Sequence, residues 1–226
     1  MKVIDLNADL GEGKGTDEEL LQIVSSASIC CGGHAGSSEL TLQVLGRSRE
    51  LGVRTGCHPG VPDRSSMGRA PIGELDRIHF NQMVDDLFRQ ISVAPESWTY
   101  LKPHGSLYNE STKLGTTAFR LVKLLIEESR LSLMGLANTA HEDLATYGLI
   151  REGFLDRRYT STGTLVARSE SNALLTDGPS ALLQSFHLMD RVDSFCVHGD
   201  NPNALVLAKF VMAGWRSAGI EVARWD

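Results

Sequence analysis

Residues 98–109 read Trp-Thr-Tyr-Leu-Lys-Pro-His-Gly-Ser-Leu-Tyr-Asn, and they show most clearly a pattern that recurs along the chain. A short apolar run, 98–101, is followed at once by Lys102 and His104, with a proline between them and a glycine after them. The run has the length of a buried strand, whereas proline and glycine are typical of a loop. The stretch therefore predicts a strand whose end carries a lysine and a histidine.

The same arrangement recurs along the chain, with amphipathic helical stretches between the apolar runs. This alternation predicts a parallel sheet with crossover helices. We expect an α/β fold, a TIM-like β/α barrel of seven or eight parallel strands, with residues 1–226 as a single catalytic domain. The candidate strands are 3–6, 26–31, 54–58, 98–101, 131–137, 152–155, 195–197 and, as the least regular, 220–223.

Start and stop signals mark several of the helices. Thr16 and Glu19 have the spacing of a capping box, in which the threonine side chain accepts a hydrogen bond from an amide of the first turn. A second helix is expected after Ser37 and should end at Gly52. Apolar residues at helical spacing over 73–91 predict a third helix, on the outside of the barrel.

Composition and charge exclude several classes of protein. The chain is 42% hydrophobic and 22% charged, as globular proteins are, and its net charge of −6 comes without a basic cluster that would favour nucleic-acid binding. No window approaches the roughly 20 apolar residues of a membrane span, and polar residues interrupt the first apolar run. We therefore expect a cytoplasmic protein. Its four cysteines lack CxxC spacing, which favours buried, reduced thiols.

The distribution of histidine is the strongest functional signal. Four of the seven histidines follow predicted strands, each beside glycine or proline: His34, His58, His104 and His198. Because the carboxyl ends of parallel strands meet at one face of a barrel, we expect all four in one pocket. We expect the same pocket to contain Asp5, Asn7, Lys102 and Asp200. The remaining histidines, His79, His141 and His187, lie in helical stretches and are expected on the surface.

The first strand carries acceptors at alternate positions. Spacing of two along an extended chain points Asp5, Asn7 and Asp9 to one side, so that all three are expected to face the barrel mouth. An equally good interpretation is that Asn7 and Asp9 cap the following turn. Glu12 comes next, between two glycines, in a loop that does not satisfy the GxxxxGK[ST] pattern of a phosphate-binding loop.

Two kinds of chemistry are open to such a pocket. Histidine and carboxylate side chains bind divalent metals, and the candidate ligands are Asp5, His34, His58 and His104. Alternatively, metal-free histidine and aspartate act as general acid and base, while Lys102 stabilises an anion. The residues alone do not decide between them.

Six motifs in order along the chain resemble the LamB/YcsF family of 5-oxoprolinase A subunits. They cover essentially the whole sequence: 5–12 (Asp-Leu-Asn-Ala-Asp-Leu-Gly-Glu), 31–36 (Cys-Gly-Gly-His-Ala-Gly), 58–69 (His-Pro, Pro-Asp and Gly-Arg), 102–109 (Lys-Pro-His-Gly-Ser-Leu-Tyr-Asn), 154–159 (Phe-Leu-Asp-Arg-Arg-Tyr) and 198–200 (His-Gly-Asp). The chain departs from the family's usual residues at Ser28, Gly33, Ser37 and Ala70, within the predicted site loops.

This resemblance implies a deformed β/α barrel related to glycoside hydrolases and deacetylases. It further implies an enzyme that opens the lactam of 5-oxo-L-proline to L-glutamate, with ATP as co-substrate and subunits B and C as partners. On this basis we expect catalytic roles for Asp9, His34, His104, His198 and Asp200. Substrate binding is expected at Asp5, Asn7, Glu12, His58, Lys102, Tyr108 and Arg157.

Two other functions remain open at this point. A metal-dependent N-deacetylase or amidase acting on a sugar or amide would use the same histidines and carboxylates as metal ligands. A non-catalytic binding protein would keep the fold and lose the chemistry, but the intact Lys102, His104, His198 and Asp200 argue against it.

Overall fold

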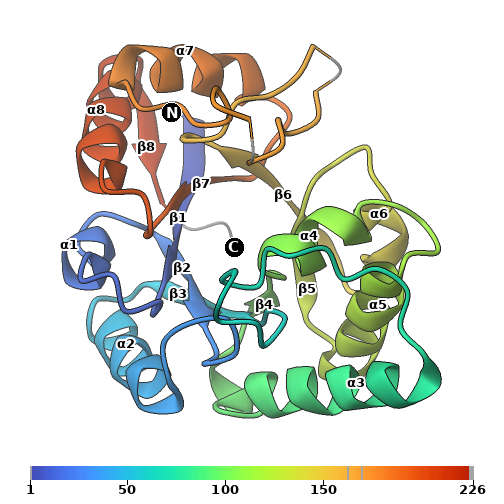
Figure 1. Ribbon diagram of the computed structural model, residues 1–226. Coiled ribbons are helices and arrows are strands. Elements are labelled where there is room, and N and C mark those ends of the chain that lie inside the picture. Colours follow the sequence, from blue (N-terminus) through green and yellow to red (C-terminus); the bar gives the residue numbers. More distant parts are fainter. Residues whose placement is uncertain (1, 162, 169, 224–226) are drawn as a thin grey trace.

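The computed structural model describes residues 2–161, 163–168 and 170–223. Its parallel strands form a ring seen end-on in Figure 1, with the helices outside it. The order around the ring is β2-β3-β4-β5-β6-β7-β1, and a second pairing of β1 with β2 closes it. The barrel strands are β1 (Lys2–Leu10), β2 (Ser26–Cys30), β3 (Arg54–His58), β4 (Tyr100–Leu101), β5 (Ser132–Gly135), β6 (Leu149–Phe154) and β7 (Ser194–His198).

Helices connect successive strands and cover the outside of the barrel (Figure 1). They are α1 (Asp17–Leu21), α2 (Ser38–Glu50), α3 (Arg77–Ile91), the 3-10 helix η1 (Pro95–Ser97), α4 (Gly105–Ser111), α5 (Thr117–Ser129), α6 (His141–Leu144), α7 (Gly178–Leu188) and α8 (Ala204–Ser217). The last strand, β8 (Ile220–Val222), pairs with the first residues of β1, outside the closed ring. The predicted α/β barrel is thus confirmed, with seven strands in the ring.

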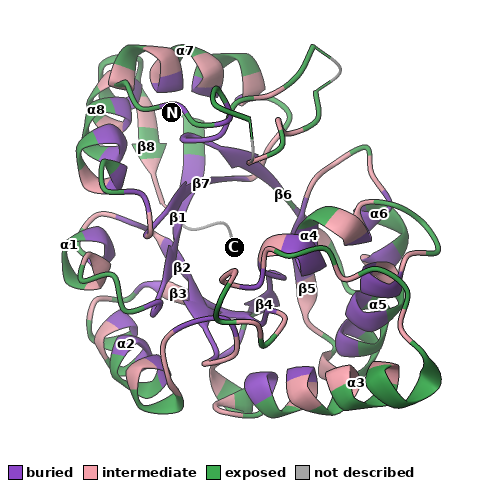
Figure 2. Cartoon of the chain, viewed as in Figure 1, coloured by how far each residue is buried: buried purple, intermediate pink, exposed green. Residues whose placement is uncertain are grey.

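The hydrophobic core lies between the strands and the helices rather than in the centre of the ring. On β1, Leu6, Ala8 and Leu10 are fully buried against the surrounding helices. The barrel strands β1–β7 are buried along most of their length, whereas the helices bury one side and expose the other (Figure 2). Alternation along a strand therefore leaves the other face of β1 to line the barrel interior.

Polar residues line the interior at β1. Asp5 accepts hydrogen bonds from the hydroxyls of Ser25, Ser26 and Ser194 at 2.6, 2.7 and 2.5 Å. Asn7 donates to the Ser194 hydroxyl at 2.8 Å. Burial raises the pKa of Asp5 to about 6 even though these three hydroxyls oppose the shift.

The expectation that Asp5, Asn7 and Asp9 face the mouth together is wrong in one respect. They do share a face, but β1 continues to Leu10, so that the three are stacked along the barrel axis. Two residues of strand advance the chain by roughly 6.6 Å, which places Asp5 roughly 13 Å below Asp9. Only Asp9 reaches the carboxyl end of the strand.

Three local predictions differ from the structure. The Thr16 hydroxyl does not cap α1 but donates to the carbonyl oxygen of Gly199 at 2.9 Å. The helix expected over 73–91 begins at Arg77, because Asp76 caps it by accepting from two amides. His141 is fully buried instead of exposed, and its Nε2 contacts the Ser111 hydroxyl at 2.9 Å.

No helix in the described ranges is both long and apolar enough to cross a membrane.

Two glycine substitutions test the packing of the barrel against a matched control. In Gly56→Ala, the new Cβ would lie 2.2 Å from the Tyr100 ring across the β3–β4 pairing, so we expect a loss of about 1–3 kcal/mol in unfolding free energy. In Gly46→Ala, on exposed α2, the Cβ meets open space and helix propensity gives a gain of about 0.5–1 kcal/mol. Urea unfolding of both variants measures whether the unfolding free energy falls in Gly56→Ala and rises in Gly46→Ala. An equal change in both variants would contradict this packing.

Candidate active site

The carboxyl ends of the strands hold two buried groups of side chains that meet at His58. We call Asp9, Lys102, Glu152 and Cys196 the lysine cluster, and Glu12, His34, His58 and His104 the imidazole cluster. Every one of these side chains is at most 7% exposed. Because the residues come from β1, β2, β3, β4, β6 and β7 and the loops after them, closure of the barrel brings them together.

The lysine cluster is centred on one ammonium group. The Nζ of Lys102 lies 2.6 Å from the carboxylate of Asp9 and 2.6 Å from that of Glu152. It also lies 3.1 Å from the sulfur of Cys196. Burial by itself would raise the pKa of Asp9, but the charge of Lys102 outweighs it and holds that pKa well below its usual range. The same carboxylates keep the pKa of Lys102 well above its ordinary value despite burial.

His198 is held by Asp156 in an arrangement typical of acid–base catalysis. Its Nδ1 lies 2.8 Å from one oxygen of Asp156, and the other oxygen accepts from the amide of His198 and from Asn201, each at 3.1 Å. Burial acts to raise the pKa of Asp156, but His198 and Asn201 lower it overall, so the carboxylate is ionised. The contact at Nδ1 leaves the Nε2 of His198 facing Asp9, 3.8 Å away. This nitrogen is therefore positioned to exchange a proton.

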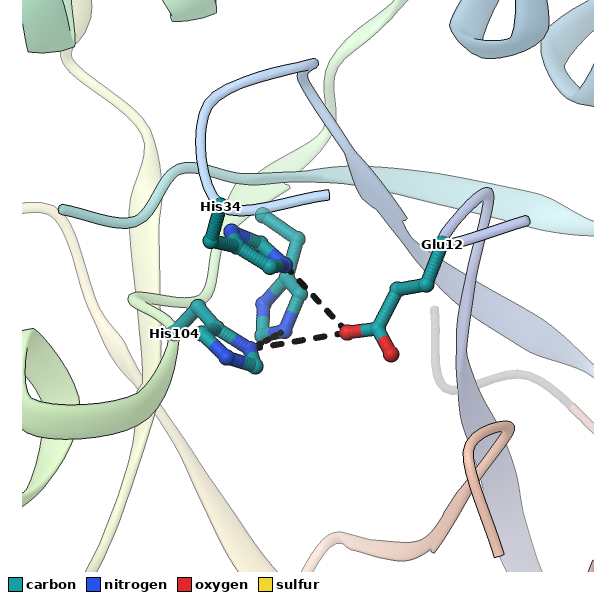
Figure 3. A group of neighbouring side chains, drawn as sticks. Glu12, His34 and His104 are labelled. Atoms are coloured by element: carbon teal, nitrogen blue, oxygen red, sulfur yellow. Dashed lines mark hydrogen bonds and ion pairs between the residues drawn. The ribbon is translucent and has the colours of Figure 1, made fainter. Parts of the chain in front are cut away.

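The imidazole cluster is compact. The rings of His34 and His104 stack with centroids 3.6 Å apart and planes 5° from parallel, and His58 meets both edge-on. One carboxylate oxygen of Glu12 lies 3.2 Å from Nε2 of His34 and 3.6 Å from Nδ1 of His104. Figure 3 shows both dashed lines converging on that oxygen.

The three imidazoles have different protonation tendencies. Burial lowers the pKa of His58 to about 3, with the charges of Lys102 and His34 acting in the same direction. Burial also holds the pKa of His104 well below its usual value. For His34, contacts with Cys30 and Glu12 outweigh burial and raise the pKa to about 9. At neutral pH, His58 and His104 are therefore uncharged.

A glutamine on α3 supports this cluster from behind. The Gln90 amide is buried and bonds both the amide and the carbonyl oxygen of Gly60, at 3.0 and 2.9 Å. A Cβ on Gly60 would come 2.4 Å from the His34 ring, and one on Gly33 would come 2.4 Å from Gln90. The small residue at Gly33, one of the departures from the family's usual residues, therefore makes room for Gln90.

Arginine residues dominate the more exposed rim. Asp200 pairs with Arg69 at 2.5 Å and with Arg168 at 3.4 Å. Burial would raise the pKa of Asp200, but these arginines and His198 lower it. Arg157 donates to the carbonyl oxygen of Val166, and its buried Nε has no hydrogen-bond partner among the described residues. Burial and the charge of Arg168 lower the pKa of Arg157 to about 10.

Most of the residues expected in the pocket lie together. Asp9, Glu12, His34, His58, Lys102, His104 and His198 form or adjoin the two clusters, and Asp200 lies beside them at the rim. Asn7 lies one layer below, with its amide 3.4 Å from Glu152. Asp5 lies deeper still and is saturated by serine hydroxyls. Asp156, rather than the neighbouring Asp200, holds the Nδ1 of His198.

Sequence reasoning missed Glu152 and did not include Asp156 or Arg69 among the site residues. A charged residue inside the apolar stretch of β6 was a usable signal, because an inward-facing carboxylate there needs a cation such as Lys102.

Tyr108, a residue expected to bind substrate, lies in α4 with its hydroxyl buried and without a well-placed partner in the described ranges. Burial and the neighbouring Glu152 raise its pKa well above the ordinary value.

Among the residues that the structure describes, two sets of side chains have the spacing to hold a metal ion. In each set, the potential ligand atoms lie within 4.8 Å of one another: Glu12, His34, His58 and His104 in one, and Asp9, Cys196 and His198 in the other. Asp5, a candidate ligand from the sequence, belongs to neither of them. His34, His58 and His104 are the candidates that the structure brings together.

Comparison with known proteins gives a consistent result across the chain. A model of the LamB/YcsF family matches residues 4–226. A protein of Neisseria meningitidis serogroup C, named as the A subunit of 5-oxoprolinase, is 36% identical over 244 residues, covering 99% of this chain and all of the relative. A protein of the same name from Histophilus somni is 36% identical over 248 residues, covering 98% of each.

Solved structures agree with the barrel. The lactam utilization protein of Thermus thermophilus superposes with a TM-score of 0.83 at 28% identity, over the full length of both chains. A polysaccharide deacetylase of Bacillus cereus has a TM-score of 0.55 at 14% identity, covering 100% of this chain and 93% of its own. The second likeness is one of fold alone, and it agrees with the expected relation to deacetylase barrels.

The substitution Lys102→Met tests the charge balance of the lysine cluster. It leaves two buried carboxylates without their cation, which we expect to cost about 3–5 kcal/mol of unfolding free energy at pH 8. Without the charge of Lys102, burial is the largest influence on Asp9 and raises its folded-state pKa above the unfolded value, and stability from such a group is present at low pH and lost as the pH rises. Urea unfolding at pH 5 and pH 8 should therefore show a smaller deficit at pH 5. A deficit independent of pH would contradict the proposed balance.

Proposed function

Because the chain belongs to the LamB/YcsF family, we propose that it is the A subunit of an ATP-dependent 5-oxoprolinase that opens 5-oxo-L-proline to L-glutamate together with subunits B and C. One observation carries this proposal. A buried, charge-balanced active site with an Asp–His pair lies at the carboxyl end of a barrel whose sequence is 36% identical, over nearly full length, to proteins named as A subunits of 5-oxoprolinase.

The chemistry of a lactam explains why ATP is a suitable co-substrate. A five-membered cyclic amide is a poor electrophile. Transfer of the terminal phosphoryl group of ATP to the amide oxygen releases ADP and makes the ring carbon much more electrophilic. Water then adds to that carbon, and the ring C–N bond breaks with protonation of nitrogen to leave an acyl phosphate. A second water hydrolyses this mixed anhydride, which gives the carboxylate of L-glutamate and releases inorganic phosphate. Each stage after phosphorylation needs a group that moves protons.

We assign proton transfer at this site to His198. Asp156 fixes one ring nitrogen, so that the other faces the pocket beside Asp9 and is free to take a proton from water. The ionised Asp156 stabilises the imidazolium that results, as a carboxylate does in other hydrolases. Asp9 and Lys102 adjoin this nitrogen and supply a fixed charge distribution that needs no reorganisation during the reaction. Within the same proposal, His34 and His104 act in catalysis and His58 contacts the substrate.

The arginines of the rim suit recognition of anions. Arg69, Arg157 and Arg168 have planar guanidinium groups that match carboxylate or phosphate geometry, and one carboxylate, that of Asp200, pairs with two of them. The Nε of Arg157 and the hydroxyl of Tyr108 are buried donors without a well-placed partner among the described residues. Asp200 then controls the orientation of Arg69 and Arg168 as well as adjoining His198. Asp5 and Asn7 support the substrate pocket from the layers beneath it.

We take residues 1–226 as one catalytic domain and place it in the cytoplasm. The four cysteines are free and buried, which suits a reducing compartment, and the proposed reaction consumes ATP. A second candidate is metal-dependent hydrolysis of an N-acyl group on a sugar or amide. The imidazole cluster favours this alternative, because its four potential ligands resemble a metal site more than an acid–base pair.

An assay of glutamate release separates these functions. Purified chain is incubated with 5-oxo-L-proline, with and without ATP and with and without the candidate B and C subunits. We expect glutamate only when ATP and both partners are present. Acetate release from an N-acetylated sugar without ATP would instead support the alternative, and inactivity in both assays would contradict each enzymatic proposal.

The substitution Asp156→Asn tests the role of His198. Loss of the carboxylate removes the group that orients and stabilises the imidazole, so we expect kcat for glutamate formation to fall about 10²–10⁴-fold. Asp85→Asn, at an exposed position of α3, is the matched control and should leave kcat unchanged. Thermal melting of both variants reports folding. Near-normal turnover of a folded Asp156→Asn protein would refute the assignment of proton transfer to His198.

A further inference from the structure

The hydrogen bonds of His58 and His104 determine where their protons lie. Nδ1 of His58 is 2.8 Å from the carbonyl oxygen of Lys102, and Nε2 of His104 is 2.8 Å from the carbonyl oxygen of Met67. A carbonyl oxygen only accepts hydrogen bonds, so each of these nitrogens carries a proton. In a neutral ring the other nitrogen then has a bare lone pair.

Those two remaining nitrogens face each other. Nε2 of His58 and Nδ1 of His104 are 2.9 Å apart, the distance of a hydrogen bond. With both rings neutral, however, no proton lies between them, and two lone pairs at this distance repel. The arrangement therefore calls for a positive group between the rings, either an additional proton or a metal ion.

The surroundings disfavour a proton. A proton between the rings makes one of them an imidazolium, and both rings are at most 3% exposed, so that this charge would be removed from water. A single proton also joins only two of the facing atoms. A divalent ion bonded to both rings and to the nearby Glu12 would satisfy all three lone pairs at once.

A carboxylate points at the same place. Glu12 is 7% exposed, and none of the ion pairs of the described residues joins it to a lysine or an arginine. Its Oε1 lies 3.6 Å from the bare nitrogen of His104 and 3.2 Å from Nε2 of His34. The ion pairs of this buried carboxylate among the described residues are with imidazoles alone, and its negative charge is suited to balance a bound cation.

We propose that Glu12, His34, His58 and His104 bind one first-row divalent metal ion of the zinc or cobalt type. For bonds of about 2.0–2.1 Å, ligand atoms at right angles are about 2.9 Å apart, and ligand atoms at about 120° are about 3.6 Å apart. The separations of 2.9, 3.2 and 3.6 Å between neighbouring ligand atoms fall within this range. The carbonyl oxygens of Lys102 and Met67 are the outer partners that fix the ring tautomers for ligation.

The second set of possible ligands does not qualify. In the group of Asp9, Cys196 and His198, the ammonium of Lys102 already lies 2.6 Å from the Asp9 carboxylate and 3.1 Å from the Cys196 sulfur. A divalent ion there would meet a fixed positive charge at short range. Three imidazole nitrogens and one carboxylate oxygen, in contrast, form a donor set that prefers zinc-like ions over Mg²⁺.

This metal site goes beyond the proposed function and does not rest on it. The ion would lie next to Asp9, whose carboxylate is 3.5 Å from Nε2 of His58, and would supply Lewis-acid chemistry to a carbonyl or water at the barrel mouth. Metal binding is measured without substrate or partner proteins. A failed glutamate assay would therefore leave the metal site standing, and a failed metal measurement would leave the lactam reaction open.

The direct test uses the untagged full-length chain. The protein is treated with a chelator, dialysed, loaded with Zn²⁺ or Co²⁺ and analysed by elemental analysis, with Mg²⁺ loading as the comparison. We expect about one tightly held Zn²⁺ or Co²⁺ per chain, visible absorption from bound Co²⁺, and a higher melting temperature with the metal. Absence of stoichiometric binding by the wild-type protein would overturn the proposal.

Variants locate the ion. Glu12→Gln keeps the size of the side chain and removes its charge, whereas His104→Ala removes a ligand. Loss of an outer partner of a metal ligand typically weakens metal binding roughly 10–100-fold, and we expect each of these variants to weaken Zn²⁺ binding by at least as much. The controls are Cys196→Ser, in the other set of ligands, and His79→Ala, at an exposed histidine, and both should bind as the wild type does. Unchanged binding by Glu12→Gln and His104→Ala, or loss of the ion in Cys196→Ser alone, would refute this location.

X-ray absorption of the wild-type zinc protein keeps the test independent of how the variants fold. We expect a shell of nitrogen and oxygen atoms at about 2.0–2.1 Å. A sulfur shell at about 2.3 Å would place the ion against a cysteine and would overturn the assignment to the imidazole cluster.

Discussion

The ammonium of Lys102, shared between the carboxylates of Asp9 and Glu152, is the interaction on which the barrel interior depends. A carboxylate removed from water is stable only when a cation or several hydrogen-bond donors replace its hydration. Two carboxylates from β1 and β6 point into the same buried space, and the side chain of Lys102 crosses the barrel from β4 to reach both. The packing of three strands is thereby coupled to one charge balance.

That balance determines what the neighbouring groups do. Two carboxylates and one ammonium leave one negative charge, while burial keeps the thiol of Cys196 neutral by raising its pKa. The Nε2 atoms of His58 and His198 both face Asp9, at 3.5 and 3.8 Å, and so lie where negative charge is in excess. His198 responds through Asp156, which fixes its other nitrogen. His58 is instead fixed by a carbonyl oxygen and shares its free nitrogen with the imidazole cluster.

The sequence was most informative for the functional side chains that directly follow a strand. Apolar runs followed by glycine, proline and histidine identified the barrel, its strands and four convergent histidines, because parallel strands end at one face whatever their exact length. The position of a side chain along the barrel axis could not be predicted in this way. Asp5 and Asp9 have the same period and the same face, and only the length of β1 places one at the mouth and the other among serines.

Contacts between distant segments were also beyond the sequence. Glu152 could be recognised as unusual within β6, but its partner is 50 positions earlier in the chain, and no local pattern joins them. Thr16 has the spacing of a capping residue, yet its hydroxyl bonds the carbonyl oxygen of Gly199 because that loop passes beside it in the closed barrel. The pairing of Asp156 with His198 joins positions 42 residues apart: this buried carboxylate holds the imidazole, whereas the more exposed Asp200, two residues after His198, pairs with arginines.

The different surroundings of Asp156 and Asp200 reflect a difference in charge between the rim and the interior of the site. At the rim, Arg69 and Arg168 share the single carboxylate of Asp200, which leaves positive charge available to anions, while the interior keeps the excess negative charge left by Asp9 and Glu152. Under the proposed function, a substrate with a carboxylate at one end and a neutral amide at the other would be favoured in a single orientation. We propose that its carboxylate stays with Arg69 and Arg168, because moving it inward would add a third anion to the lysine cluster. Its amide would then extend inward, toward the nitrogen of His198 that Asp156 leaves free.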